Sequence, residues 1–207
     1  MISVKRIREI EKKAVAMGIS EAIMMENAGA NVARILNGKI GLKGKRILVF
    51  CGTGNNAGDG LVFARHSLVY GARVDVYFIK DPKILRSNVT RKNFGVLGNI
   101  KSLGKPVKFY VKKVPKMRYD ILVDALLGTG LKESVSEEYS RVIEKFNSME
   151  GFKVSIDCPS GINSNNGKMM GSAVKPDLTI TLHDRKRGLN PGNSGEIIVT
   201  DIGIPRI

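Results

Sequence analysis

The chain has 207 residues, of which 43% are hydrophobic and 26% charged, ordinary values for one globular domain with a substantial core. No run of 18 apolar residues occurs and the N-terminus is charged, so neither a membrane span nor a secretory signal is expected. The formal net charge is +15, and residues 101–118 hold seven basic residues and no acidic one, which attracts phosphorylated metabolites or nucleic acid unless it is simply a solvated basic face.

Two amphipathic helices are predicted at the N-terminus. Residues 4–17 carry apolar side chains at helical spacing, and Gly18 is a suitable stop. Residues 20–36 carry a second apolar stripe, with Ser20 as a possible cap. We expect these helices to cover one face of a sheet or to extend a contact with a partner.

Short apolar runs then alternate with helical segments. This alternation predicts an α/β fold with a mostly parallel sheet and helices on both faces. The last two predicted strands have no helix between them, so an antiparallel or extended edge is expected there. The predicted strands are 46–50, 73–79, 107–111, 120–127, 153–158, 178–183 and 196–201, and the predicted helices are 59–69, 87–97 and 136–147.

Loops rich in glycine, hydroxyls, amides and carboxylates follow three of these strands. They are CGTGNNAGDG (51–60), GTGL (128–131) and DCPSG (157–161). In an open α/β sheet, ligands bind beyond the carboxyl ends of the strands, near the point where the strand order reverses. Three such loops at one sheet edge therefore predict a ligand site. Cys51 and Cys158 lack metal-ligand spacing and are expected to be reduced and buried, which fits a cytoplasmic protein.

The first of these loops has more than one interpretation. Gly52, Gly54 and Ala57 satisfy a relaxed dinucleotide-binding pattern, in which N–H groups at a helix start meet a phosphate. Asp59 argues against simple phosphate binding, and its structural alternative is a helix N-cap. The structural alternative for Asn55 and Asn56 is a left-handed turn.

Two aspartates near strand ends are candidates for chemistry. Asp124 lies inside the apolar run 121–127, so its carboxylate needs a hydrogen-bonding partner or a cation. Asp157 follows the run 153–156 and precedes a stiff turn at 159–161. That position suits either acid–base work or cation binding.

Six blocks of sequence resemble the YjeF N-terminal family, the NAD(P)H-hydrate epimerases. The matches run in order from about residue 5 to residue 205. The resemblance implies a Rossmann-like three-layer α/β/α sandwich, one domain over residues 1–207, and usually a homodimer. The blocks are MMENAG (24–29), GTGNNAGDG (52–60), VDALLGTGL (123–131), SIDCPSGI (155–162), LTITLHDRKRGL (178–189) and DIGIP (201–205).

The resemblance also implies the substrate. The family interconverts the R and S forms of hydrated NADH and NADPH at carbon 6 of the nicotinamide ring, so that an S-specific dehydratase can restore the cofactor. In many microbes that dehydratase is fused behind this domain. Because this sequence stops just after DIGIP, we expect no fused dehydratase here and a separate polypeptide as the pathway partner.

Site residues follow from the same resemblance. Asp157 is the best candidate acid or base. The family's potassium ligands fall on Asn56, Asp124 and Ser160, which implies one K⁺ per subunit. Its substrate contacts fall on Asn55, Asn56, Ala57, Gly58, Asp59, Gly128, Thr129, Gly130, Leu131, Lys132, Glu133, Ser134 and Asp157.

Two further positions, Ala57 and Lys186, bear on the resemblance. Ala57 stands where the common form of the motif, NNGGDG, has glycine, a change that a negative φ accommodates. Lys186 matches a lysine that the family usually carries before Gly188. It would meet a phosphate or a developing charge, or else be an exposed cation at a strand end.

Two other function classes remain open on the sequence. An NAD-dependent oxidoreductase would use Gly52, Gly54 and Ala57 for pyrophosphate and Asp81 for ribose, but no catalytic histidine or Tyr-Lys arrangement is evident. The second is a non-catalytic nucleotide- or RNA-binding module, since the same fold occurs in a family of mRNA-decapping enhancers. The intact loops argue against such a module, so nucleic acid is not expected as the main partner.

Overall fold

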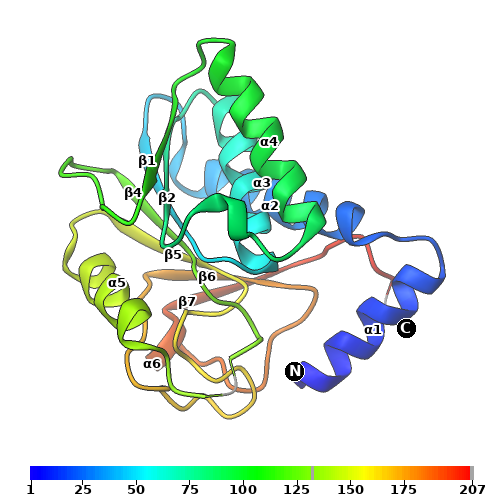
Figure 1. Ribbon diagram of the computed structural model, residues 1–207. Helices are drawn as coiled ribbons and strands as arrows, with labels where there is room; N and C mark the ends of the chain where they lie inside the picture. Colours follow the sequence, from blue (N-terminus) through cyan, green and yellow to red (C-terminus); the bar gives the residue numbers. More distant parts are fainter. Residues whose placement is uncertain (132, 206–207) are drawn as a thin grey trace.

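The computed structural model describes residues 1–131 and 133–205. It contains a seven-stranded, all-parallel sheet in the order β3-β2-β1-β4-β5-β6-β7 (Figure 1). The strands are β1 (Arg46–Cys51), β2 (Arg73–Phe78), β3 (Val107–Val111), β4 (Ile121–Ala125), β5 (Phe152–Ile156), β6 (Leu178–Leu182) and β7 (Glu196–Thr200). The helices are α1 (Val4–Ala16), α2 (Glu21–Ile40), α3 (Asn55–Val69), α4 (Asn88–Ser102), α5 (Glu137–Ser148) and α6 (Pro191–Ser194), with a short 3₁₀ helix at Pro82–Ile84.

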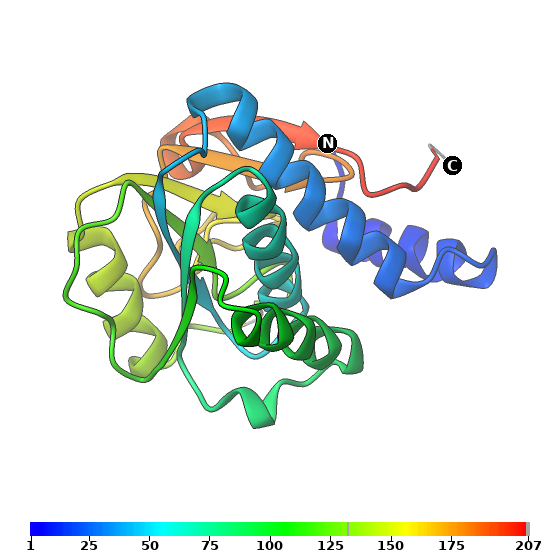
Figure 2. The same cartoon turned by 90° about the horizontal axis from the view of Figure 1, so that it is seen from above.

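Helices cover both faces of the sheet, as the sequence predicts. Helices α2, α3 and α4 lie on one face and α5 lies on the other (Figures 1 and 2). The alternation along β1 explains this division, because Ile47 and Val49 pack into the first core while Leu48 and Phe50 pack into the second, under α5. The predicted three-layer α/β/α architecture is therefore confirmed. None of the helices in the described part of the chain is long and apolar enough to cross a membrane.

The N-terminal segment is tied to the loop that follows β6. The Ile2 amide donates to the Arg185 carbonyl at 2.8 Å, and the Arg187 amide donates to the Ile2 carbonyl at 3.1 Å. The Val4 amide donates to the Asn165 side chain at 2.9 Å, and Ser3 caps α1. Helix α1 therefore stands beside the carboxyl ends of the strands, where Figure 2 shows it crossing below α2.

Four expectations from the sequence are wrong in detail. Helix α3 begins at Asn55, not at 59, so part of the first loop is helix. The left-handed turn considered for Asn55 and Asn56 is absent, and Gly54 is the N-cap rather than Asp59. Strands β6 and β7 pair in parallel, not antiparallel, because the segment between them is about as long as a crossover requires.

Candidate active site

A cavity of about 710 Å³ lies at the carboxyl end of the sheet. Strand order runs outward in opposite directions from the neighbouring strands β1 and β4, which makes this the topological switch point where α/β folds bind ligands. The loop after β1 with the start of α3, the loop after β4, and the turn after β5 all line it, together with α1. The three glycine-rich loops therefore meet around one space.

Asp124 holds two of these loops together. Its side chain is fully buried, and each carboxylate oxygen accepts one backbone and one hydroxyl hydrogen bond. Oδ1 accepts from the Leu126 amide at 3.1 Å and the Ser160 hydroxyl at 2.6 Å. Oδ2 accepts from the Ser160 amide at 2.8 Å and the Ser155 hydroxyl at 2.9 Å. Burial raises the pKa of Asp124 above its usual range, and these bonds from Ser160, Leu126 and Ser155 work in the opposite direction.

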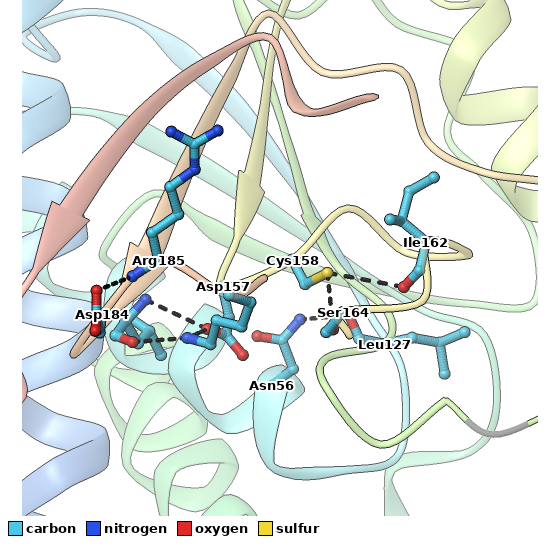
Figure 3. A network of polar contacts seen from close by, with 10 residues as sticks. Asn56, Leu127, Asp157, Cys158, Ile162, Ser164, Asp184 and Arg185 are labelled. Carbon is cyan, nitrogen blue, oxygen red and sulfur yellow. Dashed lines mark hydrogen bonds and ion pairs between the residues drawn. The ribbon is translucent and has the colours of Figure 1, made fainter. Parts of the chain in front are cut away.

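Asn56 joins the third loop to the same cluster. Its amide nitrogen donates to the Leu127 carbonyl at 2.9 Å, and the Ser160 hydroxyl lies 3.2 Å from that same carbonyl oxygen. This bond fixes the orientation of the amide, which leaves Asn56 Oδ1 buried with no hydrogen-bond partner among residues 1–131 and 133–205. Figure 3 shows Asn56 between Leu127 and Asp157, with the amide oxygen on the side of Asp157. A buried acceptor without a partner is costly in free energy, so a hydrogen-bond donor or a cation is expected beside it.

The cluster suits an alkali cation better than a transition metal. The described residues contain no group of three His, Cys, Asp or Glu side chains that could hold a metal ion. Asn56, Asp124 and Ser160 instead offer an amide, a carboxylate and a hydroxyl, all with hard oxygens. Ser160 connects the three, because its hydroxyl meets Asp124 and also the Leu127 carbonyl to which Asn56 donates. The unpartnered Asn56 oxygen and the single buried carboxylate fit a monovalent ion.

Asp157 forms a buried ion pair with Lys186. The ammonium contacts Asp157 Oδ1 and donates to the Leu182 carbonyl at 2.6 Å, and only 1% of the lysine side chain is exposed. The Leu182 amide lies 3.3 Å from the same carboxylate oxygen. Asp157 has φ 69°, in the left-handed region, and its amide is held by the Ile180 carbonyl at 2.8 Å. Both groups line the cavity, and the burial of the lysine shows that it is not an exposed cation at a strand end.

Most of the predicted substrate contacts line the cavity. Ala57 and Gly58 do not, because they face the interior: a Cβ on Gly58 would lie 2.4 Å from the Met25 sulfur. Asp124 and Ser160 also lie behind the cavity wall, and Lys132 lies outside the described residues. The predicted contacts that do line the cavity are Asn55, Asn56, Asp59, Gly128, Thr129, Gly130, Leu131, Glu133, Ser134 and Asp157.

Several lining residues could not be identified from the sequence. Arg8 and Glu11 reach the cavity from α1, Arg86 from the loop before α4, and Tyr139 from α5. Arg8 and Glu11 lie on the polar side of α1. The apolar stripe of this helix predicted the helix itself but not that its polar side faces a cavity. The position of Arg8 and Glu11 depends on the binding of residues 1–4 to the loops before and after β6, which no local sequence pattern predicts.

The dinucleotide pattern in the first loop has a structural explanation. A Cβ on Gly52 would lie 1.9 Å from the Leu126 carbonyl oxygen, so this glycine permits the close approach of two loops. Asp81 caps the short 3₁₀ helix by accepting from the Lys83 amide at 2.9 Å. In the oxidoreductase interpretation, Gly52 would contact pyrophosphate and Asp81 would contact ribose. In the structure, Gly52 serves packing and Asp81 caps a helix.

Comparison with known proteins decides the family. A sequence model described as "YjeF-related protein N-terminus" matches residues 21–188. The chain belongs to the YjeF N-terminal family. The prediction from the six sequence blocks is therefore confirmed, and the family model leaves α1 outside its bounds although α1 lines the cavity.

Relatives within the family are of two lengths. Proteins named NAD(P)H-hydrate epimerase from Nitrosopumilus maritimus and Cenarchaeum symbiosum are 35% and 38% identical, and the match covers 99% of this chain and 95% of each relative. The Bifunctional NAD(P)H-hydrate repair enzyme Nnr of Methanothermobacter thermautotrophicus is 39% identical over 91% of this chain. The match spans only 37% of that bifunctional relative.

A solved structure supports the fold independently. The crystal structure of a yeast protein superposes with a TM-score of 0.81 at 24% identity, covering 97% of this chain and 86% of the yeast chain. At this level of identity the similarity concerns the architecture. The seven strands and the covering helices therefore share the overall arrangement of the yeast chain.

The packing role of Gly52 predicts a difference between two neighbouring glycines. Gly52→Ala should lower the melting temperature. The added Cβ would clash with the Leu126 carbonyl, and the backbone there can shift only at a cost in stability. Gly54→Ala is the matched control, since nothing lies within 4 Å of a Cβ there and its φ is −97°. Equal melting temperatures for the two variants, measured by thermal unfolding, would contradict this assignment.

The buried pair predicts an unusual pattern of stabilities. Asp157→Asn should destabilise the fold by about 3–5 kcal/mol, because it leaves the Lys186 ammonium buried without a counter-charge. The double variant Asp157→Asn/Lys186→Met should recover much of that loss, since no charge remains to be desolvated. Denaturant unfolding of both variants measures this, and a double variant less stable than the single one would argue against the pair.

Proposed function

We propose that this protein interconverts the R and S hydrates of NADH and NADPH by inverting carbon 6 of the hydrated nicotinamide ring. The observation that carries the proposal is the Asp157–Lys186 pair, set in a cavity that all three glycine-rich loops line. The names of the two full-length relatives support the same reaction. An ionisable pair intact in a formed cavity favours an enzyme over the non-catalytic alternative.

Inversion at this carbon requires proton transfer. The ring nitrogen can expel the hydroxyl group from carbon 6 once a proton reaches the departing oxygen, and water can then add to the other face while a base takes a proton. Asp157 is positioned for this work, since Oδ1 is held by Lys186 and the Leu182 amide while the carboxylate still lines the cavity. A well-placed acid or base of this kind typically contributes ~10²–10⁴-fold.

The cavity also offers groups for a pyrophosphate. Arg8 and Arg86 are exposed guanidinium groups that line it from α1 and from the loop before α4. Helix α3 starts at the cavity with no side-chain cap on its free N–H groups. Both features favour anions. The basic segment 101–118, in contrast, contributes no residue to this cavity, so its charge is not a local counter-charge for the substrate.

A potassium ion belongs to the same proposal. Asn56, Asp124 and Ser160 would hold it, and the buried Asn56 oxygen is the acceptor that lacks a partner without it. When bound, the ion would supply positive charge beside the buried Asp124 carboxylate and fix the three loops relative to one another. It takes no part in the proton transfers described above.

Three related expectations remain proposals. An S-specific dehydratase would consume the product, as the bifunctional names of longer relatives suggest. The protein would act in the cytoplasm, where reduced cofactors accumulate, and it would form a homodimer. Size-exclusion chromatography with light scattering tests the dimer, and a monomer at micromolar concentration would contradict it.

The direct test uses a mixture of both hydrates and an S-specific dehydratase. Without an epimerase, only the S form is consumed rapidly. Adding this protein should make the R form disappear as well, and Asp157→Asn should slow that step at least about 100-fold. Replacing potassium by tetramethylammonium in the buffer should lower the rate, because the proposed cation site is then empty.

Different results of this assay would refute different parts of the proposal. An R form that persists at its spontaneous rate in the presence of wild-type protein would refute the proposed function. Equal rates in potassium and tetramethylammonium would refute the cation alone. Salt-sensitive RNA binding that is unaffected by Asp157→Asn, in a protein without epimerase activity, would favour the binding module.

A further inference from the structure

The cavity contains a second buried carboxyl group whose surroundings differ from those of Asp157. Asp59 lies in α3, just beyond its first turn, and is 8% exposed. Among the described residues, the ion pairs include Asp157 with Lys186 but none with Asp59. The two carboxyl groups therefore share one cavity, and of the two only Asp157 has a direct cationic partner in the described part of the chain.

The two groups approach the cavity from different sides. A second cavity of about 390 Å³ lies under α1 and α2, and Asp59 and Glu11 line both cavities. Asp157 lines only the larger one. Asp59 is thus on the side toward α1 and α2, while Asp157 is at the end of β5. A planar ring bound between these sides would present one face to each carboxyl group.

The electrostatic surroundings of the two groups differ. Burial raises the pKa of Asp59 well above its usual range, the charges of Asp157 and Glu11 raise it further, and Lys186 acts in the opposite direction. Asp157, in contrast, is in direct contact with the lysine ammonium. Pairs of carboxyl groups in unlike environments are the usual arrangement for one acid and one base in the same site.

We propose that Asp59 is a second catalytic residue, which exchanges a proton with the hydroxyl group or water on the ring face opposite to that served by Asp157. This inference rests on the proposed epimerase function. It adds a second proton-transfer group, so that each face of the ring is served by one carboxyl group. Glu11 is the nearest rival, but it is only partly buried and sits on α1, whereas Asp59 is fixed in a helix packed against the sheet.

Protons and electron pairs balance in the proposed inversion. In one direction, the nitrogen lone pair forms a C=N bond as the carbon 6–oxygen bond breaks, and the Asp59 carboxyl proton goes to the departing hydroxyl to give water. Water then adds to the opposite face, the C=N pair returns to nitrogen, and Asp157 accepts the released proton. The reverse passage returns the proton, and exchange with solvent resets the two carboxyl groups between turnovers.

The test separates carbon–oxygen cleavage from inversion. Each hydrate is incubated in ¹⁸O-water with Asp59→Asn, and both epimerisation and oxygen exchange at carbon 6 are followed by mass spectrometry. Epimerisation should fall at least about 100-fold. The epimer whose hydroxyl faces Asp157 should still exchange its oxygen with retained configuration, and the other epimer should not. Asp157→Asn should show the reciprocal pattern at a temperature where it is folded.

The control variant is Asp120→Asn. It makes the same change at the opposite end of β4, where the side chain accepts from the Arg46 amide, and it should keep wild-type rates. The fold of Asp59→Asn is checked by thermal unfolding. A carboxyl whose pKa is raised on folding destabilises the protein increasingly as pH rises above 3.8, so this variant should melt at or above the wild-type temperature at pH 7 and lose that advantage in acid.

The outcomes that overturn the inference are specific. Epimerisation by Asp59→Asn within about tenfold of wild type would overturn it, because that loss is below what a proton-transfer group contributes. Loss of oxygen exchange in both epimers would overturn the assignment to one face, and the retained-configuration pattern in Glu11→Gln would transfer the role to Glu11. Absence of activity in the wild type would refute the epimerase function itself.

Discussion

The site depends on one buried carboxylate. Asp124 has no cation in direct contact among the described ion pairs, yet each of its oxygens accepts a hydrogen bond from one backbone amide and one hydroxyl. An ionised group at this depth is stable only with such bonds or with a cation. Because the donors come from the loop after β4 and the turn after β5, satisfying Asp124 forces these two segments to lie together.

The rest of the site follows from that junction. The Leu127 carbonyl is positioned to accept from Asn56, which brings in the start of α3, and the turn at 157–161 holds Asp157 in its left-handed conformation. Residues 1–4 then bind the loop after β6 and thereby support the lysine that pairs with Asp157. The result is a cavity with two buried aspartates, of which Asp157 alone has an ion-pair partner among the described residues.

Local patterns were sufficient for the architecture. Apolar runs and their spacing predicted all seven strands, because the inner strands are buried on both faces and carry few polar residues, while the partly exposed edge strands β3 and β7 are still rich in β-branched or aromatic residues. The loops after β1, β4 and β5 could be placed at one edge by parallel topology alone. Pairing directions were harder. The β6–β7 crossover contains only the four-residue helix Pro191–Ser194, too short to recognise by periodicity, so its parallel pairing was missed. The burial of Lys186 was missed for a related reason, since a strand-end lysine is exposed unless a distant carboxylate is brought to it.

The account is tested most directly by amide hydrogen exchange on Asp124→Asn. Asparagine cannot accept from both the Leu126 and Ser160 amides, because one oxygen becomes an NH₂ group, so exchange should accelerate in both 126–131 and 157–162. Asp75→Asn, which changes a buried aspartate bonded to Tyr119 at 2.6 Å, should leave these segments unchanged. Unaltered exchange in both loops of Asp124→Asn would contradict the claim that this carboxylate assembles the site.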